Sequence, residues 1–92
     1  MSVLVRYQEV GMTRQQYDEA GRLLEQGDFP PEGLELHVLH GDDGSLRVSE
    51  LWASADHQRT FNDDVLLPVL NKVGIQMSGP AEIIPVHELF QF

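Results

Sequence analysis

The feature that most constrains the fold of this chain is the order in which its apolar residues change period. A repeat of two, typical of a half-buried strand, alternates along the chain with a repeat of about 3.6, typical of an amphipathic helix. The changes fall at turns or caps, such as Thr13 with Gln16 in a capping-box arrangement. They predict strands near residues 2–10, 34–40, 45–53 and 81–90, and helices near residues 13–26 and 55–73.

The resulting β-α-β-β-α-β order predicts a ferredoxin-like α+β fold. With right-handed crossovers, the four strands form one antiparallel sheet and the two helices lie on one face of it. Pro68 lies inside the second helix and removes a backbone donor there, so we expect a kink or break near Leu66. Since the chain has only 92 residues, we expect residues 1–92 to form a single domain.

The sequence also predicts a homodimer. A sheet with both helices on one face leaves the other face open. Apolar residues such as Leu4, Leu39 and Leu51 remain for it, or the residues of opposite parity if the helices cover the first set. In a short chain such a surface favours a partner, and a second copy is the simplest one. The C-terminal Phe90 and Phe92 share one strand parity, so both could dock on that partner.

Charge and composition exclude several classes of function. Fifteen acidic residues against six basic ones give a net charge of −9, which repels phosphate backbones and anionic lipid surfaces. We therefore expect neither nucleic acid nor membrane as a partner. The chain has no cysteine, no visible signal peptide and no apolar stretch long enough to cross a bilayer, so we expect a cytoplasmic protein.

The sequence predicts neither a metal site nor a bound cofactor. His37 and His40 are three residues apart on a strand, so they point to opposite faces and cannot hold one ion together. The glycine-rich and nucleophile motifs of nucleotide-binding proteins and hydrolases are also missing.

Two candidate catalytic residues are polar side chains among apolar strand positions. Glu50 lies between Val48 and Trp52, where burial would raise its pKa and suit it to proton abstraction. An exposed place at the end of the sheet would instead leave it inert. His87, in the last predicted strand, could act as a base near neutral pH or form hydrogen bonds at an interface.

Three aromatic residues are candidates for substrate binding. Tyr7 shares the parity of the apolar positions before it, and its phenol could orient a substrate hydroxyl or form a hydrogen bond in the core. Trp52 either walls a pocket or anchors the core where strand meets helix. Phe61 lies on the apolar stripe of the second helix.

The segments Leu51–Asp56 and Leu67–Leu70, with Phe61 between them and Gly74 after them, resemble the antibiotic biosynthesis monooxygenase-like dimeric α+β barrel superfamily. The resemblance covers nearly the whole chain. It implies a homodimer whose two sheets close into a barrel, with a pocket between sheet and helices. Some members oxidise polycyclic aromatic compounds with molecular oxygen and need neither metal nor flavin, whereas others degrade haem. The asparagine and histidine of the haem-degrading branch have no counterparts here, and Phe61 falls near the position of its tryptophan.

Two functions from different classes therefore remain. The first is a cofactor-independent monooxygenase or related pocket enzyme that acts on a small aromatic or polyketide-like molecule. The second is a non-catalytic dimeric module of the same fold that binds a small molecule or a partner. An apolar cavity holding Tyr7, Trp52 and either Glu50 or His87 would favour the enzyme, and an interior filled by side chains would favour the module.

Overall fold

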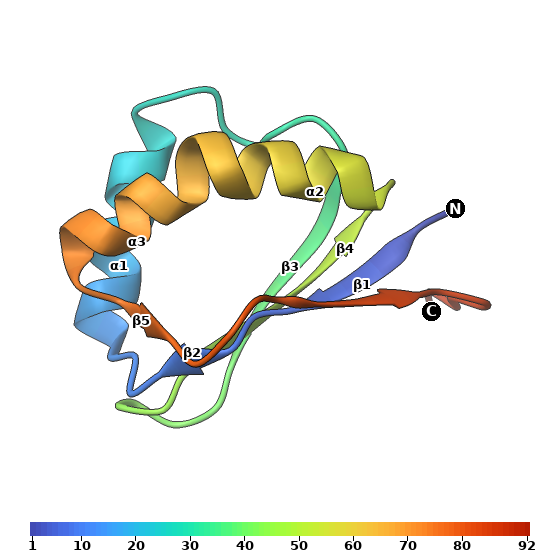
Figure 1. The fold of residues 1–92 in the computed structure, drawn as a ribbon. Helices are drawn as coiled ribbons and strands as arrows, with labels where there is room; N and C mark the ends of the chain where they lie inside the picture. Colours follow the sequence, from blue (N-terminus) through green and yellow to red (C-terminus); the bar gives the residue numbers. More distant parts are fainter.

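The computed structural model describes residues 1–92 as a small α+β protein with a four-stranded antiparallel sheet and helices packed on one face of it (Figure 1). The strand order in the sheet is β3-β4-β1-β6, and each neighbouring pair is antiparallel. This arrangement is consistent with a ferredoxin-like fold. The sheet comprises β1 (Val3–Arg6), β3 (Leu34–His40), β4 (Arg47–Trp52) and β6 (Glu82–Pro85).

Helix α1 (Arg14–Glu25) begins where the capping residues predict. The Thr13 hydroxyl accepts a hydrogen bond from the backbone N–H of Gln16, and the Gln16 side chain accepts one from the N–H of Thr13. These reciprocal bonds satisfy two amide groups that the first turn of a helix leaves free. The helix then turns Tyr17, Ala20 and Leu24 toward the core.

The second helical region runs without interruption through α2 (Ala55–Phe61), a π-helical turn η1 (Asn62–Leu66) and α3 (Leu67–Val73). The break that Pro68 predicts near Leu66 therefore takes the form of a widened turn. In η1 the N–H of Leu67 donates to the carbonyl of Asn62, five residues back. A π-turn is one way in which a helix accommodates a proline, whose ring clashes with a carbonyl four residues back.

The first strand is not continuous, contrary to the prediction for residues 2–10. After Arg6 the chain leaves the main sheet, and β2 (Glu9–Val10) pairs with β5 (Gln76–Met77) to form a separate two-stranded sheet. The alternation of buried residues nevertheless continues through Tyr7 to Glu9. This continued alternation places the Glu9 carboxylate on the side of the core.

The last strand is shorter than predicted and ends at Pro85 instead of near residue 90. Val86 still donates its N–H to Ser2, but β1 begins at Val3, so the following residues have no strand beside them. Phe90, which is 72% exposed, and Phe92 therefore do not dock on this chain.

A bulge in β3 changes which residues face outward. The register shifts between Leu34, which pairs with Trp52, and Leu36, which pairs with Leu51. Such a shift reverses the faces of all later residues in the strand. Leu39 consequently packs against the core, and its predicted place on the open face is wrong. The apolar residues of the open face are Leu4, Leu36, Val38, Leu51 and Ile84.

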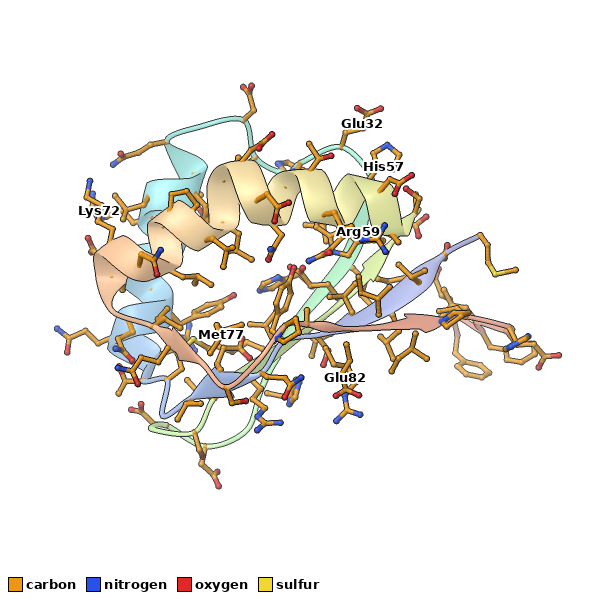
Figure 2. The ribbon with its side chains drawn as sticks, in the orientation of Figure 1. Glu32, His57, Arg59, Lys72, Met77 and Glu82 are labelled. Carbon is orange, nitrogen blue, oxygen red and sulfur yellow. The ribbon has the colours of Figure 1, made fainter.

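The core lies between the sheet and the helices. Its largest fully buried side chain is Trp52, which packs against Phe61 with the ring centroids 5.6 Å apart. Figure 2 shows Glu82 of β6 on the opposite, open side of the sheet. Met77 of β5 packs against the core. The two sides of the sheet therefore differ, with the aromatic core on one and the apolar open face on the other.

Candidate functional site

A cavity of about 350 Å³ lies between the inner face of the sheet and the helices. Its size falls in the range of about 300–1,000 Å³ that is usual for small-molecule sites. Twelve of its nineteen lining residues are hydrophobic, so its walls suit an apolar or aromatic ligand. The interior is therefore not filled by side chains. Tyr7 and Glu50 line the cavity but Trp52 does not, so the cavity meets the condition stated for the enzyme only in part.

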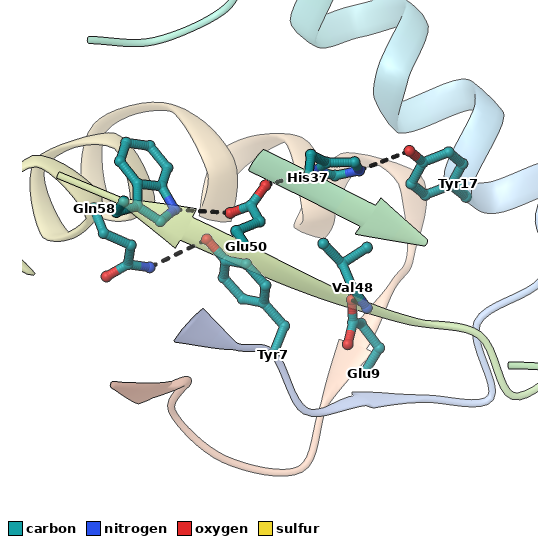
Figure 3. A network of polar contacts seen from close by, with 8 residues as sticks. Tyr7, Glu9, Tyr17, His37, Val48, Glu50 and Gln58 are labelled. Carbon is teal, nitrogen blue, oxygen red and sulfur yellow. Dashed lines mark hydrogen bonds and ion pairs between the residues drawn. The ribbon is translucent and has the colours of Figure 1, made fainter. Parts of the chain in front are cut away.

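A chain of polar contacts runs along one wall of this cavity (Figure 3). The indole N–H of Trp52 donates to Oε1 of Glu50 over 3.0 Å. Oε2 of Glu50 lies 2.6 Å from Nδ1 of His37, and Nε2 of His37 lies 2.7 Å from the hydroxyl of Tyr17. Three side chains from two strands and one from a helix are therefore linked in one line.

The sheet register brings the central two residues together. His37 on β3 is directly opposite Glu50 on β4, on the face that the helices cover. Glu50 is only 5% exposed, whereas the side chain of His37 is 33% exposed. The carboxylate is therefore a buried support, and the imidazole is the member that ligands and solvent reach.

The hydrogen-bond partners of His37 indicate which of its ring nitrogens carries the hydrogen. Burial raises the pKa of the Tyr17 hydroxyl, so it remains protonated at neutral pH and can donate to Nε2 of His37. Nδ1 of His37 then carries the ring hydrogen and donates a hydrogen bond to Glu50. A carboxylate that fixes the tautomer of a histidine is the arrangement that general bases use in many enzymes.

Tyr7 forms a second buried polar contact beside this chain. Its hydroxyl accepts a hydrogen bond from the amide of Gln58 on α2 over 3.2 Å (Figure 3). Burial, and then the negative charge of Glu50, raise the pKa of Tyr7 far above its usual value. Tyr7 is therefore a neutral donor and not a phenolate at any physiological pH.

Glu9 is a buried carboxylate on another part of the cavity wall. It is 6% exposed, and its Oε2 accepts the backbone N–H of Val48 over 3.0 Å. Its Oε1 is buried and has no hydrogen-bond partner. Burial raises the pKa of Glu9, and hydrogen bonds from its own backbone N–H and from that of Val48 only partly oppose this effect.

Glu9→Gln should change stability in a pH-dependent way. Because the pKa is raised on folding, the proton on Glu9 stabilises the folded wild type at low pH, and this contribution is lost as the pH rises through the folded-state pKa. We compare the melting temperature of the variant minus that of the wild type at two pH values. This difference should be higher near pH 7 than near pH 4, which lies close to the ordinary carboxyl pKa. Glu25→Gln, at an exposed carboxylate of the cavity rim, is the control. An identical difference at both pH values would contradict the expectation.

The structure brings together four of the five predicted site residues. Tyr7, Glu50 and Phe61 line the cavity. Trp52 lies behind the wall as a core residue that holds Glu50 and packs on Phe61, so it does not itself form the wall. His87 follows β6 in an exposed segment and is not among the residues of this cavity.

Three residues of the site were not predicted. Tyr17 has the spacing of an ordinary core residue of the first helix, and the sequence singles out His37 only as half of a histidine pair that cannot hold one metal ion. That pair does point to opposite faces, because His40 contacts Ser49 while His37 contacts Glu50. Glu9 continues the alternating parity of Tyr7, and this signal could have identified it as buried.

No protein-family model matches the chain, and no curated protein matches it either. The structure contains no group of three or more histidine, aspartate or glutamate side chains placed to hold a metal ion. None of its helices combines the length and the apolar character that a membrane crossing requires. The candidate site therefore has to be interpreted from its own geometry.

Proposed function

We propose that the protein is a small-molecule enzyme in which His37, held by Glu50, removes a proton from a neutral hydroxyaromatic compound bound in the cavity. The observation that carries this proposal is an accessible imidazole beside an apolar cavity, with a buried carboxylate on its other nitrogen. A positioned general base of this kind contributes roughly 10²–10⁴-fold to a rate.

The ligand would approach His37 from the cavity. Its hydroxyl, or an acidic C–H next to a ring, takes the place of the Tyr17 hydroxyl at Nε2. When Nε2 accepts the proton, the imidazolium formed is stabilised by the Glu50 carboxylate 2.6 Å from Nδ1. The apolar walls exclude water from the resulting anion.

The charges around the cavity favour a neutral ligand. Glu9 and Glu50 lie in its wall and Asp18 and Glu25 are also among its lining residues, with Arg22 as the only lysine or arginine among them. The negative charge of these residues repels ligands that carry a carboxylate or a phosphate group. A neutral phenol or a neutral carbon acid does not experience this repulsion.

The finer proposal is a cofactor-independent monooxygenase, as the resemblance to the antibiotic biosynthesis monooxygenase-like superfamily implies. In such a reaction the deprotonated substrate is oxidised by molecular oxygen. A ring methylene becomes a carbonyl, one oxygen atom enters the product and the other leaves as water with the two hydrogens of the methylene. His37 would remove the first of these hydrogens as a proton.

Oxygen uptake with anthrone, a tricyclic ketone with an acidic methylene, tests this finer proposal. We expect consumption of one O₂ for each anthrone converted to anthraquinone, and a rate above that of buffer. A second candidate, the non-catalytic binding module, is favoured by the fact that Tyr17 already occupies Nε2 of His37. Binding of anthrone without oxygen uptake or proton removal would support the module and contradict the enzyme.

We further propose that the protein is a homodimer that associates through the open face of its sheet, as a dimeric α+β barrel. Leu36, Leu51, Leu4 and Ile84 form a row across all four strands of this face. Leu36 is half exposed, and large apolar areas of this kind mark interaction surfaces. The exposed Phe90 and Phe92 add further apolar surface.

Leu36→Glu should therefore prevent association. Light scattering at micromolar concentration should give twice the chain mass of 10.4 kDa for wild type and the single mass for the variant. The matched control is Val65→Glu, which places the same charge at an exposed valine of η1, in the helical layer. A monomeric wild type, or a dimer that both substitutions leave intact, would contradict a dimer built through this face.

A further inference from the structure

We propose that Tyr17 is a second catalytic residue, whose hydroxyl donates a hydrogen bond to the ligand oxygen that loses its proton to His37. This inference rests on the proposed function, because it assumes that His37 is the base and that the ligand binds in the same cavity. It adds the chemical class of the reacting group, which is the hydroxyl of a phenol and not an isolated C–H.

The contact between Tyr17 and His37 is the observation that carries the inference (Figure 3). The Tyr17 hydroxyl lies 2.7 Å from Nε2 of His37, and both side chains line the cavity. Both are only partly buried, so a ligand in the cavity can reach the two groups together. A phenol oxygen that enters between them can give its proton to Nε2 and accept a hydrogen bond from the Tyr17 hydroxyl.

The ligand has to separate these two groups by only a small distance. Two hydrogen bonds that meet at one oxygen hold their outer atoms roughly 4.5 Å apart, so the Tyr17 hydroxyl would move by roughly 2 Å. The bond to His37 is the only hydrogen bond of this hydroxyl. No other hydrogen bond therefore has to break when the ligand enters.

The charges of the cavity make a neutral donor necessary. Proton removal leaves a negative charge on the ligand oxygen, and the Glu50 carboxylate lies behind His37. The only lysine or arginine of the lining is Arg22, which is bound to Glu19 at the surface. The hydroxyl of Tyr7 belongs to a side chain that is 4% exposed. Tyr17 is thus the accessible donor closest to the place where the charge develops.

The proton balance of the step agrees with this role. The O–H bond of the ligand breaks, a bond from Nε2 of His37 to the hydrogen forms, and the electron pair stays on the ligand oxygen. Tyr17 keeps its own proton, because burial raises its pKa, and its hydrogen bond stabilises the charge on that oxygen. A carbon acid has no lone pair on the carbon that loses the proton, so Tyr17 offers no such bond to it there.

The absorption spectrum of bound 6-cyano-2-naphthol tests the inference, because the phenol and phenolate forms of this probe absorb at different wavelengths. At a fixed pH, we expect the ratio of phenolate to phenol in the bound probe to be about tenfold lower or more in Tyr17→Phe than in wild type, since one hydrogen bond to a charged oxygen is lost. The exchange of anthrone hydrogens with deuterated solvent should be as fast in this variant or faster, because no hydroxyl then occupies Nε2. A merely structural role of Tyr17 would slow the exchange as well.

Thr60→Val removes an exposed hydroxyl outside the cavity and should keep the wild-type ratio. Circular dichroism of each variant shows whether the fold is retained. An unchanged ratio in Tyr17→Phe, a loss of both ionisation and exchange in that variant, or no binding of the naphthol by wild type would each overturn the inference. The proposed function would still stand in these cases if wild type exchanges anthrone in a manner that depends on His37, whereas the absence of that exchange would contradict the proposed function itself.

Discussion

Trp52→Ala should unfold a large part of the protein under conditions in which the wild type is folded. The side chain is fully buried and packs against Phe61, and truncations of this size cost about 3–5 kcal/mol. The variant also loses the N–H that binds Glu50, and a buried carboxylate oxygen left unpaired costs about 1–3 kcal/mol more. Small domains are stable by only about 5–15 kcal/mol in total.

Urea denaturation followed by circular dichroism measures this effect, because Trp52 is the single tryptophan and its fluorescence is lost in the variant. Trp52→Phe retains most of the buried area and should lose much less stability. Val65→Ala, at a partly exposed residue of η1 away from the open face of the sheet, is the control and should change the free energy of unfolding little. A Trp52→Ala variant within about 0.5 kcal/mol of wild type, the usual effect of a surface substitution, would contradict the role of Trp52 as the core anchor.

The sequence predicts the main elements well because their signals are local. The capping box at Thr13 and the left-handed Gly74 mark helix ends that the structure confirms within a residue or two. The errors concern partners that are distant along the chain. Whether residues 2–10 form one strand depends on the pairing of Glu9 with Met77, and no short pattern around Glu9 contains that information.

The residues of the candidate site also fall into those that local sequence patterns predict and those that they do not. Glu50 could be found because it is a carboxylate at an otherwise apolar parity, a rule that needs only its own strand. His37 could not be placed by this rule, because the bulge between Leu34 and Leu36 changes the parity of β3. Tyr17 has the spacing of an ordinary core residue on α1, and only the packing of that helix on β3 shows its contact with His37.

His37→Ala should have the largest effect on activity. Removal of the base leaves the ligand hydroxyl or C–H without a proton acceptor, and we expect a loss of about 10²–10⁴-fold in rate. His40→Ala is a matched control, because it removes the same side chain from the same strand on the opposite face, where His40 contacts Ser49. The stability of the two variants should be compared by thermal melting before their rates are interpreted.

Glu50→Gln tests whether the carboxylate positions the base. If the amide oxygen keeps the bond from Trp52, the NH₂ group faces Nδ1 of His37 and favours the tautomer with its proton on Nε2. That tautomer cannot accept a proton from the ligand, so the rate should fall with the imidazole still present. Nitrogen chemical shifts of the His37 ring report the tautomer directly, and a purely structural role of Glu50 would not reverse them.

The most direct measurement of proton abstraction is the exchange of the acidic methylene hydrogens of anthrone with deuterated solvent, followed by NMR in the absence of oxygen. This reaction needs only a base and a binding cavity, so it separates the role of His37 from any later step with oxygen. The wild type and His40→Ala should accelerate exchange above buffer, and His37→Ala should not. Exchange that is equally fast in wild type and His37→Ala, or no faster than in buffer for any of them, would contradict general-base catalysis by His37.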